Sequence, residues 1–236
     1  MKNRYVLCAV LVGLACLCVP VLPFAQTQDK PQVKIPEPGV PQIMTMEGKF
    51  VRAAYNNEGY VILGYQVANR SIGDPWILLD VGITLREGVP DFDLTRAAVS
   101  LDTPGGKNVP LPSIEEYRKV NMNAVQARAK VQRDSINYFP PNASKACSIQ
   151  FFTDIEQRAM PWEKVELTDQ RACLGRFYFP VAGGITHGQH WLNVKFAKTV
   201  VRVPFRILTE DEEKLLSKNY KDISKQVKDA FAPKKK

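Results

Sequence analysis

The stretch Trp76-Ile-Leu-Leu-Asp-Val-Gly-Ile-Thr-Leu-Arg86 (WILLDVGITLR) decides the fold class of this chain. Every second position from Ile77 to Leu85 is apolar, whereas Asp80, Thr84 and Arg86 share the opposite parity. Successive side chains of a strand point to opposite faces of a sheet, so the pattern predicts a β-strand with one buried face and one face turned to solvent.

Further strands are predicted on both sides of this stretch. Alternation of apolar residues recurs in the ranges 61–68, 98–101, 107–111, 147–151, 173–179, 191–196 and 201–207. The turn Thr103-Pro-Gly-Gly106 indicates a hairpin between two of them, and Pro204 favours an edge position for the last strand because it cannot donate to a ladder. We therefore expect a mainly β domain over residues 47–208, an immunoglobulin-like antiparallel β-sandwich, with a partly open β-barrel as the alternative.

Two helices accompany the predicted strands. Ser113-Ile-Glu-Glu116 is typical of a capping box and predicts a helix over about residues 114–137, placed at the edge of the sheet. Thr209-Glu-Asp-Glu212 opens a second, amphipathic helix that, with the terminal lysines, occupies residues 209–236. This C-terminal helix either docks on its own domain or is presented to a partner or a membrane surface.

The N-terminal 25 residues are typical of a signal peptide. Lys2 and Arg4 precede an apolar run over residues 6–22, and cleavage after Ala25 would release the remainder into the periplasm or the extracellular space. Two alternatives stay open. Pro23 is a poor residue at its place before the cut, so the segment 6–22 could remain as an anchor, and Cys16 or Cys18 could carry a lipid. The proline-rich residues 26–46 are expected to form an extended tether.

Cysteine usage agrees with export. Cys8, Cys16 and Cys18 lie in the predicted signal peptide, which leaves Cys147 and Cys173 as an even pair in an oxidising compartment. Both fall on the apolar parity of their predicted strands, so a disulfide between them is expected and would contribute about 3–4 kcal/mol by chain-entropy arithmetic.

Charge argues against a nucleic-acid-binding protein. The formal net charge of +8 includes Lys2 and Arg4 in the predicted signal peptide and three lysines at positions 234–236, so the folded body is only weakly basic.

Residues able to carry chemistry are sparse. The two histidines, His187 and His190, are weak metal candidates, because a spacing of three on a strand directs the imidazoles to opposite faces. No zinc-protease or nucleophile-elbow motif is present, and the aspartates at positions 80, 91, 93 and 102 lack a spacing diagnostic of an acid/base pair. No cofactor is predicted.

These observations predict an exported, non-enzymatic binding or accessory module of the cell envelope or extracellular space. Its partner would be another envelope or extracellular protein, contacted through the C-terminal helix or an edge strand. Nucleic acid is not expected as a partner, and membrane contact is expected only if the N-terminal segment is uncleaved or lipidated. Two alternatives remain, a secreted metal-dependent hydrolase centred on His187 and His190, and an assembly subunit that pairs through an edge strand.

Overall fold

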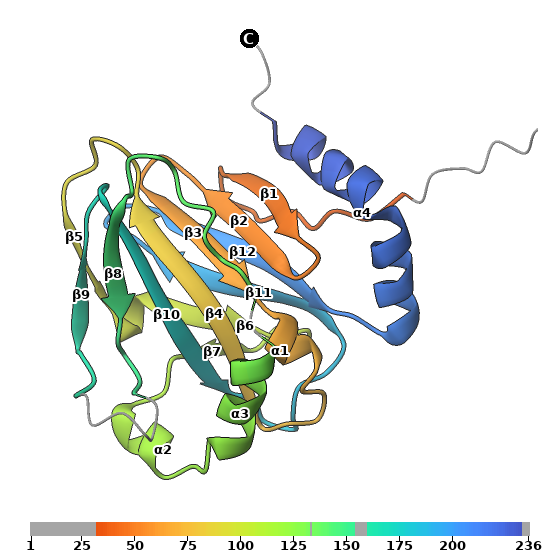
Figure 1. The fold of residues 1–236 in the computed structure, drawn as a ribbon, viewed down its shortest axis with the longest axis horizontal. Helices are drawn as coiled ribbons and strands as arrows, with labels where there is room; N and C mark the ends of the chain where they lie inside the picture. Colours follow the sequence, from red (N-terminus) through yellow and green to blue (C-terminus); the bar gives the residue numbers. More distant parts are fainter. Residues whose placement is uncertain (1–31, 133, 154–159, 233–236) are drawn as a thin grey trace, which may run out of the picture. The chain divides into compact units, whose positions relative to one another are not determined.

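The computed structural model describes residues 32–132, 134–153 and 160–232, and within them the chain is mainly β (Figure 1). The predicted signal peptide, residues 1–25, and the terminal lysines, residues 234–236, lie outside the described residues. Among the helices of the described residues, none combines the length and the apolar character that a membrane crossing requires.

The largest sheet begins as an antiparallel meander. Its strands β1 (Ile43–Gly48), β2 (Val51–Tyr55), β3 (Gly59–Gly64) and β4 (Trp76–Leu85) pair in chain order. Strand β10 (Arg171–Pro180) then pairs antiparallel with β4, and β8 (Lys145–Ile149) ends the sheet in parallel with β10. The expectation of a purely antiparallel sandwich is therefore wrong at this end. The chain leaves β8 and passes through β9 before it enters β10, and such a crossover allows parallel pairing.

Two smaller sheets complete the β structure. One has the order β12 (Val200–Ile207), β11 (Gly188–Lys195), β6 (Val99–Asp102) and β7 (Asn108–Pro110), and the other pairs β5 (Phe92–Thr95) with β9 (Lys164–Leu167). A short 3-10 helix, Arg96–Ala98, connects β5 to β6. The predicted hairpin at residues 103–106 joins β6 to β7, and β12, which contains Pro204, lies at the end of its sheet as predicted. None of the sheets that the described residues form closes into a barrel.

One hydrophobic core lies between the two larger sheets. Leu63 and Val81 of the first sheet belong to the same buried cluster as Leu192 and Val203 of the second. Strand β12 also approaches β2 and β3, so the second sheet packs against the meander strands of the largest sheet.

Strand β4 is buried on both faces, which corrects the expectation of a solvent-exposed polar face. Asp80 and Thr84 are as inaccessible as the apolar residues between them. The cover is the segment that follows residue 133, which crosses the sheet in front of β3 and β4 (green in Figure 1). Glycines make room for it, because a Cβ at Gly64 would lie 2.9 Å from Ile136 and one at Gly82 would lie 2.7 Å from Phe139. We call residues 134–142 the strap.

The predicted helix over 114–137 is two shorter helices, α2 (Ile114–Arg118) and α3 (Asn123–Val131). The capping box of Ser113 and Glu116 is confirmed. The helix breaks because the Asn121 side chain accepts a hydrogen bond from the backbone N–H of Asn123, at 3.0 Å, a local turn that competes with helical pairing. The break changes which side chains of the segment face the sheet, and the apolar Val131 at the end of α3 is 84% exposed.

A second boundary also differs from the prediction. The alternation over residues 61–68 predicts one strand, but β3 ends at Gly64 and a short helix, α1 (Gln66–Asn69), follows. The Asp134 side chain of the strap accepts a hydrogen bond from the backbone N–H of Gln66 at 2.8 Å, which satisfies a donor at the start of α1. A tertiary contact therefore overrides the local alternation.

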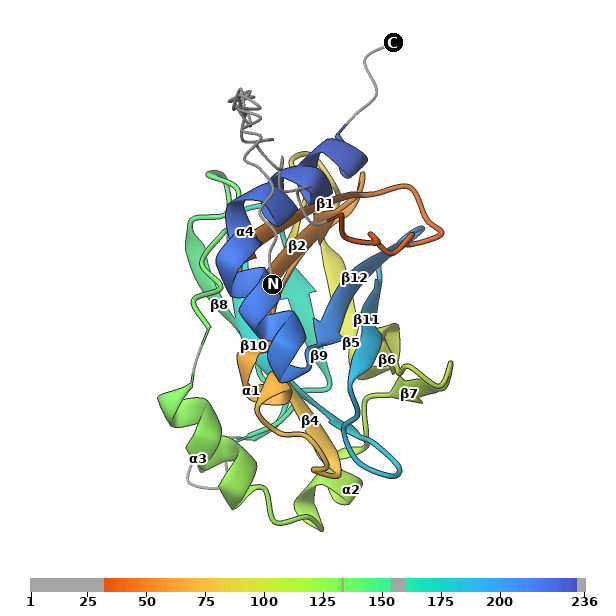
Figure 2. The same cartoon turned by 90° about the vertical axis from the view of Figure 1, so that its right-hand side faces the viewer.

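Helix α4 (Glu210–Phe231) covers the outer edge of β1 (Figure 2). It opens with the predicted capping box between Thr209 and Glu212. Its buried Leu216 and Ile223 pack with Met46 of β1, and the Tyr220 hydroxyl donates to the Met46 carbonyl oxygen at 3.3 Å. Of the two alternatives for this helix, docking on its own domain is the observed one.

The predicted tether, residues 26–46, is too long at its C-terminal end, because residues from Ile43 onward form β1. The described part before β1 also contacts the domain. Pro38 is buried, and its carbonyl oxygen accepts a hydrogen bond from Arg202 of β12 at 2.6 Å. The apolar residues at positions 44 and 46 explain the difference, since both are buried on β1.

Candidate functional site

The two histidines do not form a ligand set. His190 lies on β11, 1% exposed, stacked on Phe205, with Nδ1 3.0 Å from the Gly188 carbonyl oxygen. Burial lowers the pKa of His190 to about 4, so it is neutral near pH 7. His187 is exposed on the preceding loop. Within the described ranges, no group of three or more histidine, cysteine, aspartate or glutamate side chains could hold a metal ion.

The candidate aspartates are also dispersed. Asp80 of β4 is paired with Arg176 of β10 at 3.2 Å, and Asp93 of β5 is paired with Lys164 of β9 at 2.5 Å. Burial opposes the charge of Asp102 on β6, but hydrogen bonds from Asn108, Asn193 and Arg202 lower its pKa overall. These three carboxylates lie on three different sheets and serve ion pairs, and Asp91 is exposed in the loop before β5.

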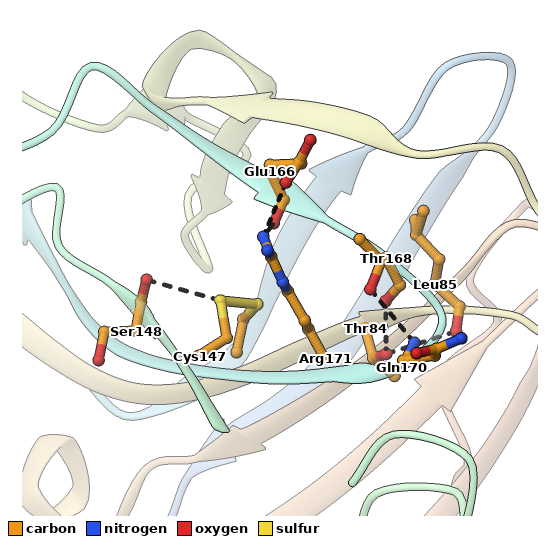
Figure 3. The surroundings of a disulfide bond; sticks show 9 residues. Thr84, Leu85, Cys147, Ser148, Glu166, Thr168, Gln170 and Arg171 are labelled. Atoms are coloured by element: carbon orange, nitrogen blue, oxygen red, sulfur yellow. Dashed lines mark hydrogen bonds and ion pairs between the residues drawn. A yellow bond between two sulfur atoms is a disulfide. The ribbon is translucent and has the colours of Figure 1, made fainter. Parts of the chain in front are cut away.

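The predicted disulfide is confirmed. Cys147 of β8 and Cys173 of β10 are directly opposite each other in the parallel ladder, with Cα atoms 4.1 Å apart (Figure 3). Cys173 is fully buried, whereas Cys147 is partly exposed. The bond therefore fixes the last strand of the largest sheet to the core.

Strand β8 is the end strand of its sheet, and no strand of the described residues pairs with its outer edge. The backbone N–H of Lys145 donates to the Gln170 carbonyl oxygen at 2.9 Å, at the start of the β10 ladder. Orientation alternates along a strand, so the backbone groups of Cys147 and Ile149 also face β10, whereas those of Ala146 and Ser148 face outward. Both outward residues, Ala146 and Ser148, are exposed and have small side chains.

The outward edge of β8 can pair with another chain segment, because Gln150, the residue directly after the strand, already does so. The Gln150 carbonyl oxygen accepts a hydrogen bond from the backbone N–H of Trp162 at 2.7 Å, which closes one end of this edge. Ala146 and Ser148 precede this contact and present the same backbone geometry.

Among the described residues, the other end strand of the largest sheet and both end strands of the second sheet carry features that limit further strand pairing. Helix α4 lies along β1, and the Gln42 side chain pairs with the outward backbone of β12 at Arg202. Its Oε1 accepts from the Arg202 N–H at 2.9 Å, and its Nε2 donates to the Arg202 carbonyl oxygen at 2.6 Å. At the far end of the second sheet, β7 is three residues long and ends in Pro110. Such devices prevent unwanted strand pairing, and β8 carries no comparable cover among the described residues.

A groove of about 870 Å³ lies beside the open edge, between β8 and β9. Figure 1 shows the two strands next to each other at one side of the molecule. The disulfide and β10 line the groove on one side, and Lys164 and Glu166 of β9 line it on the other. Arg171 of β10 reaches towards β9 and donates to the Glu166 carboxylate at 2.8 Å (Figure 3).

Aromatic side chains support the closed end of the groove. Phe152 and Tyr178 line it and pack edge to face, with ring centroids 5.5 Å apart, and Tyr117 of α2 packs against both. Trp162 also lines the groove and is 44% exposed, which is unusual for so large an apolar residue. Helices α2 and α3 thus hold these aromatic side chains in place, because Gln126 of α3 donates to the hydroxyl of Tyr117 on α2.

A second cleft, of about 650 Å³, lies on the second sheet beside Trp191 and Arg202. The Arg202 guanidinium lies over the Trp191 ring, 4.7 Å from its centroid, and bonds to Asp102, Asn193 and the Pro38 carbonyl. These internal contacts give Arg202 a structural role, because it binds the segment before β1 to the second sheet.

Sequence reasoning does not identify the groove residues. Ala146, Ser148 and Trp162 carry no motif, and the outward orientation of the first two depends on a parallel pairing that alternation alone does not reveal. The signal available is the disulfide, because it places two predicted strands side by side and leaves one of them at an edge. Comparisons with protein-family models, with curated proteins and with solved structures found no match to this chain.

Proposed function

We propose that this protein is an exported, non-enzymatic binding module with an immunoglobulin-like sandwich fold, and that it contacts its protein partner through the open edge of β8. Export is supported by the pattern of residues 1–25 and agrees with the disulfide. A sandwich is supported by the single core that the two larger sheets share.

The observation that carries the proposal is the contrast between sheet edges. Residues of the chain itself cover β1 and β12, whereas the outward backbone of Ala146 and Ser148 borders a groove that ends at an exposed tryptophan. An unprotected edge is a hazard in an isolated domain, so its retention favours a partner that adds a strand there.

The hydrolase alternative and a partner contact through α4 receive less support than the edge of β8, whereas an assembly subunit that pairs through an edge strand would use the same edge. A metal-dependent hydrolase would require His187 and His190 to converge, and His190 is buried against Phe205 with its Nδ1 at a backbone carbonyl. Presentation of α4 would require its apolar face to be available, and that face packs on β1.

The proposal is tested by substitutions at position 148. Ser148→Pro removes an outward N–H but leaves the ladder to β10 complete, because the Ser148 backbone does not face β10. Ser148→Ala keeps that N–H and is the matched control. Both variants are expressed with residues 1–25 in the native host, and envelope fractions are cross-linked and purified. The proposal expects a specific envelope protein to be retained by the wild type and by Ser148→Ala and lost with Ser148→Pro. Equal retention by all three would contradict it.

A further inference from the structure

The groove beside β8 has the features of a site for one extended strand. It offers backbone donors and acceptors at alternate residues along one side, and contact of Gln150 with Trp162 closes one end. A segment that pairs with Ala146 and Ser148 would directly continue the ladder of the largest sheet. Its side chains would alternate between the two faces of that sheet.

The side chains that line the groove favour acidic residues in such a segment. They include Lys164 and Arg171, one carboxylate, Glu166, and Arg176, whose charge is already paired with the buried Asp80. The Lys164 and Arg171 side chains are 64% and 41% exposed although each belongs to an ion pair. Exposed ion pairs contribute little to stability, so the two cations are able to exchange their present partners for a carboxylate of a ligand at small cost.

The closed end favours an apolar side chain. The exposed Trp162 lines the same groove as the buried rings of Phe152 and Tyr178, which Tyr117 of α2 holds in place. A half-exposed tryptophan at the end of a groove is typical of a residue that dominates the energy of binding.

We infer that the groove between β8 and β9 binds a single extended peptide segment containing acidic residues, which adds as a strand to β8 and places an apolar side chain against Trp162. This inference rests on the proposed function, since it specifies the ligand of the same edge. A folded second copy of this chain is the less suitable occupant, because β9 forms the opposite wall of the groove and leaves a whole sheet less room than a single strand.

The inference is tested with two fluorescent peptides of about eight residues, a length that covers the open edge with flanking residues. Both alternate the same valine and tyrosine residues with a charged residue, which is glutamate in one peptide and lysine in the other. Fluorescence anisotropy with the full chain is expected to show about tenfold tighter binding of the glutamate peptide, and its affinity is expected to fall severalfold between about 50 and about 200 mM salt. Equal binding of the two peptides, or no binding, would overturn the inference.

Variants then locate the bound peptide. Ser148→Pro and Trp162→Ala are each expected to weaken binding of the glutamate peptide by about tenfold or more, and Ser148→Ala is expected to bind as the wild type does. Should Ser148→Pro fail to fold, hydrogen exchange on the wild type decides. The peptide is expected to protect the amides of Ala146 and Ser148, and their unchanged exchange in the bound state would overturn the inference.

Failure of this inference is distinguishable from failure of the proposed function. If neither peptide binds while the envelope partner still depends on position 148, the edge binds a partner and the peptide chemistry is wrong. A wild-type dimer that Ser148→Pro dissociates, measured by sedimentation, would assign the edge to a second copy and would also overturn the inference.

Discussion

At the scale of single residues, the half-buried Asp134 and the buried His190 make the stability of the fold depend on pH. Asp134 of the strap is more than half buried, and burial raises its pKa to about 6 in spite of the hydrogen bond from Gln66. His190 has the opposite shift in direction, to about 4, because burial lowers the pKa of a base. Neither residue is needed for the proposed binding edge, so their substitutions test the fold independently of function.

Asp134→Asn is expected to stabilise the protein at neutral pH. The folded pKa of Asp134 lies above its unfolded value of 3.8, so the folded state holds a proton that the unfolded state has lost between about pH 4 and pH 6. The wild type therefore loses stability from this group as pH rises through that window. Urea unfolding should show a gain of about 1–2 kcal/mol for Asp134→Asn at about pH 7.5, discounted for partial exposure, and little change near pH 3.5. The exposed Asp91→Asn is the control, and an equal gain in that variant would refute the assignment.

His190→Gln is expected to remove a loss of stability on the acidic side. The folded pKa of about 4 lies below the ordinary histidine pKa of 6.5, which the unfolded state retains, so the unfolded state takes up a proton first as pH falls from about 6.5 to about 4. The wild-type free energy of unfolding should fall across this window, and the same measurement on His190→Gln should show a smaller fall. His187→Gln keeps the buried imidazole and should retain the wild-type slope. A slope that does not depend on position 190 would show that His190 is not the group responsible.

At the scale of elements, the fold depends on covers that are added to the sheets. Helix α4 covers β1, and the strap covers β3 and β4. Helix α4 contacts β1 through Leu216 and Ile223. The strap contacts the sheet through Ile136 and Phe139, which lie over glycines of β3 and β4.

Truncating the buried face of α4 is expected to destabilise the whole domain. Leu216→Ala and Ile223→Ala should each lower the free energy of unfolding by about 2 kcal/mol or more, because both side chains are buried against Met46. Leu215→Ala, at a position 47% exposed, should change it by less than about 0.5 kcal/mol. Chemical denaturation of the three variants provides the comparison. Three equal effects would mean that α4 is not part of the cooperative fold.

Filling the space under the strap is expected to be costly. Gly82→Ala would place a Cβ 2.7 Å from the Phe139 ring, so the strap or the strand must shift, at about 1–3 kcal/mol. Gly105→Ala meets no atom within 4 Å and should be nearly neutral. Adding Phe139→Leu to Gly82→Ala should recover part of the loss in a thermal or urea unfolding experiment. An absence of coupling between positions 82 and 139 would refute the contact.

At the scale of the whole molecule, the sequence predicts more of the elements than of their arrangement. Both capping boxes, the hairpin at residues 103–106, the edge position of Pro204 and the disulfide are local or pairwise features, and the structure confirms them. Burial of Asp80 and the parallel pairing of β8 arise from contacts between distant segments, which alternation cannot report. The candidate binding edge of β8 also depends on contacts between distant segments. Whether a strand edge is open depends on where all the other segments lie, and local sequence alternation does not contain that information.

The central claim is that β8 presents an open edge at Ala146 and Ser148, and amide hydrogen exchange in the free protein, resolved residue by residue by NMR, tests it most directly. The account predicts an alternation along β8. The amides of Cys147 and Ile149, which face β10, should be strongly protected, whereas those of Ala146 and Ser148 should exchange rapidly. Strong protection of Ala146 and Ser148 in the free protein would contradict the account, because it would mean that another segment already covers the edge.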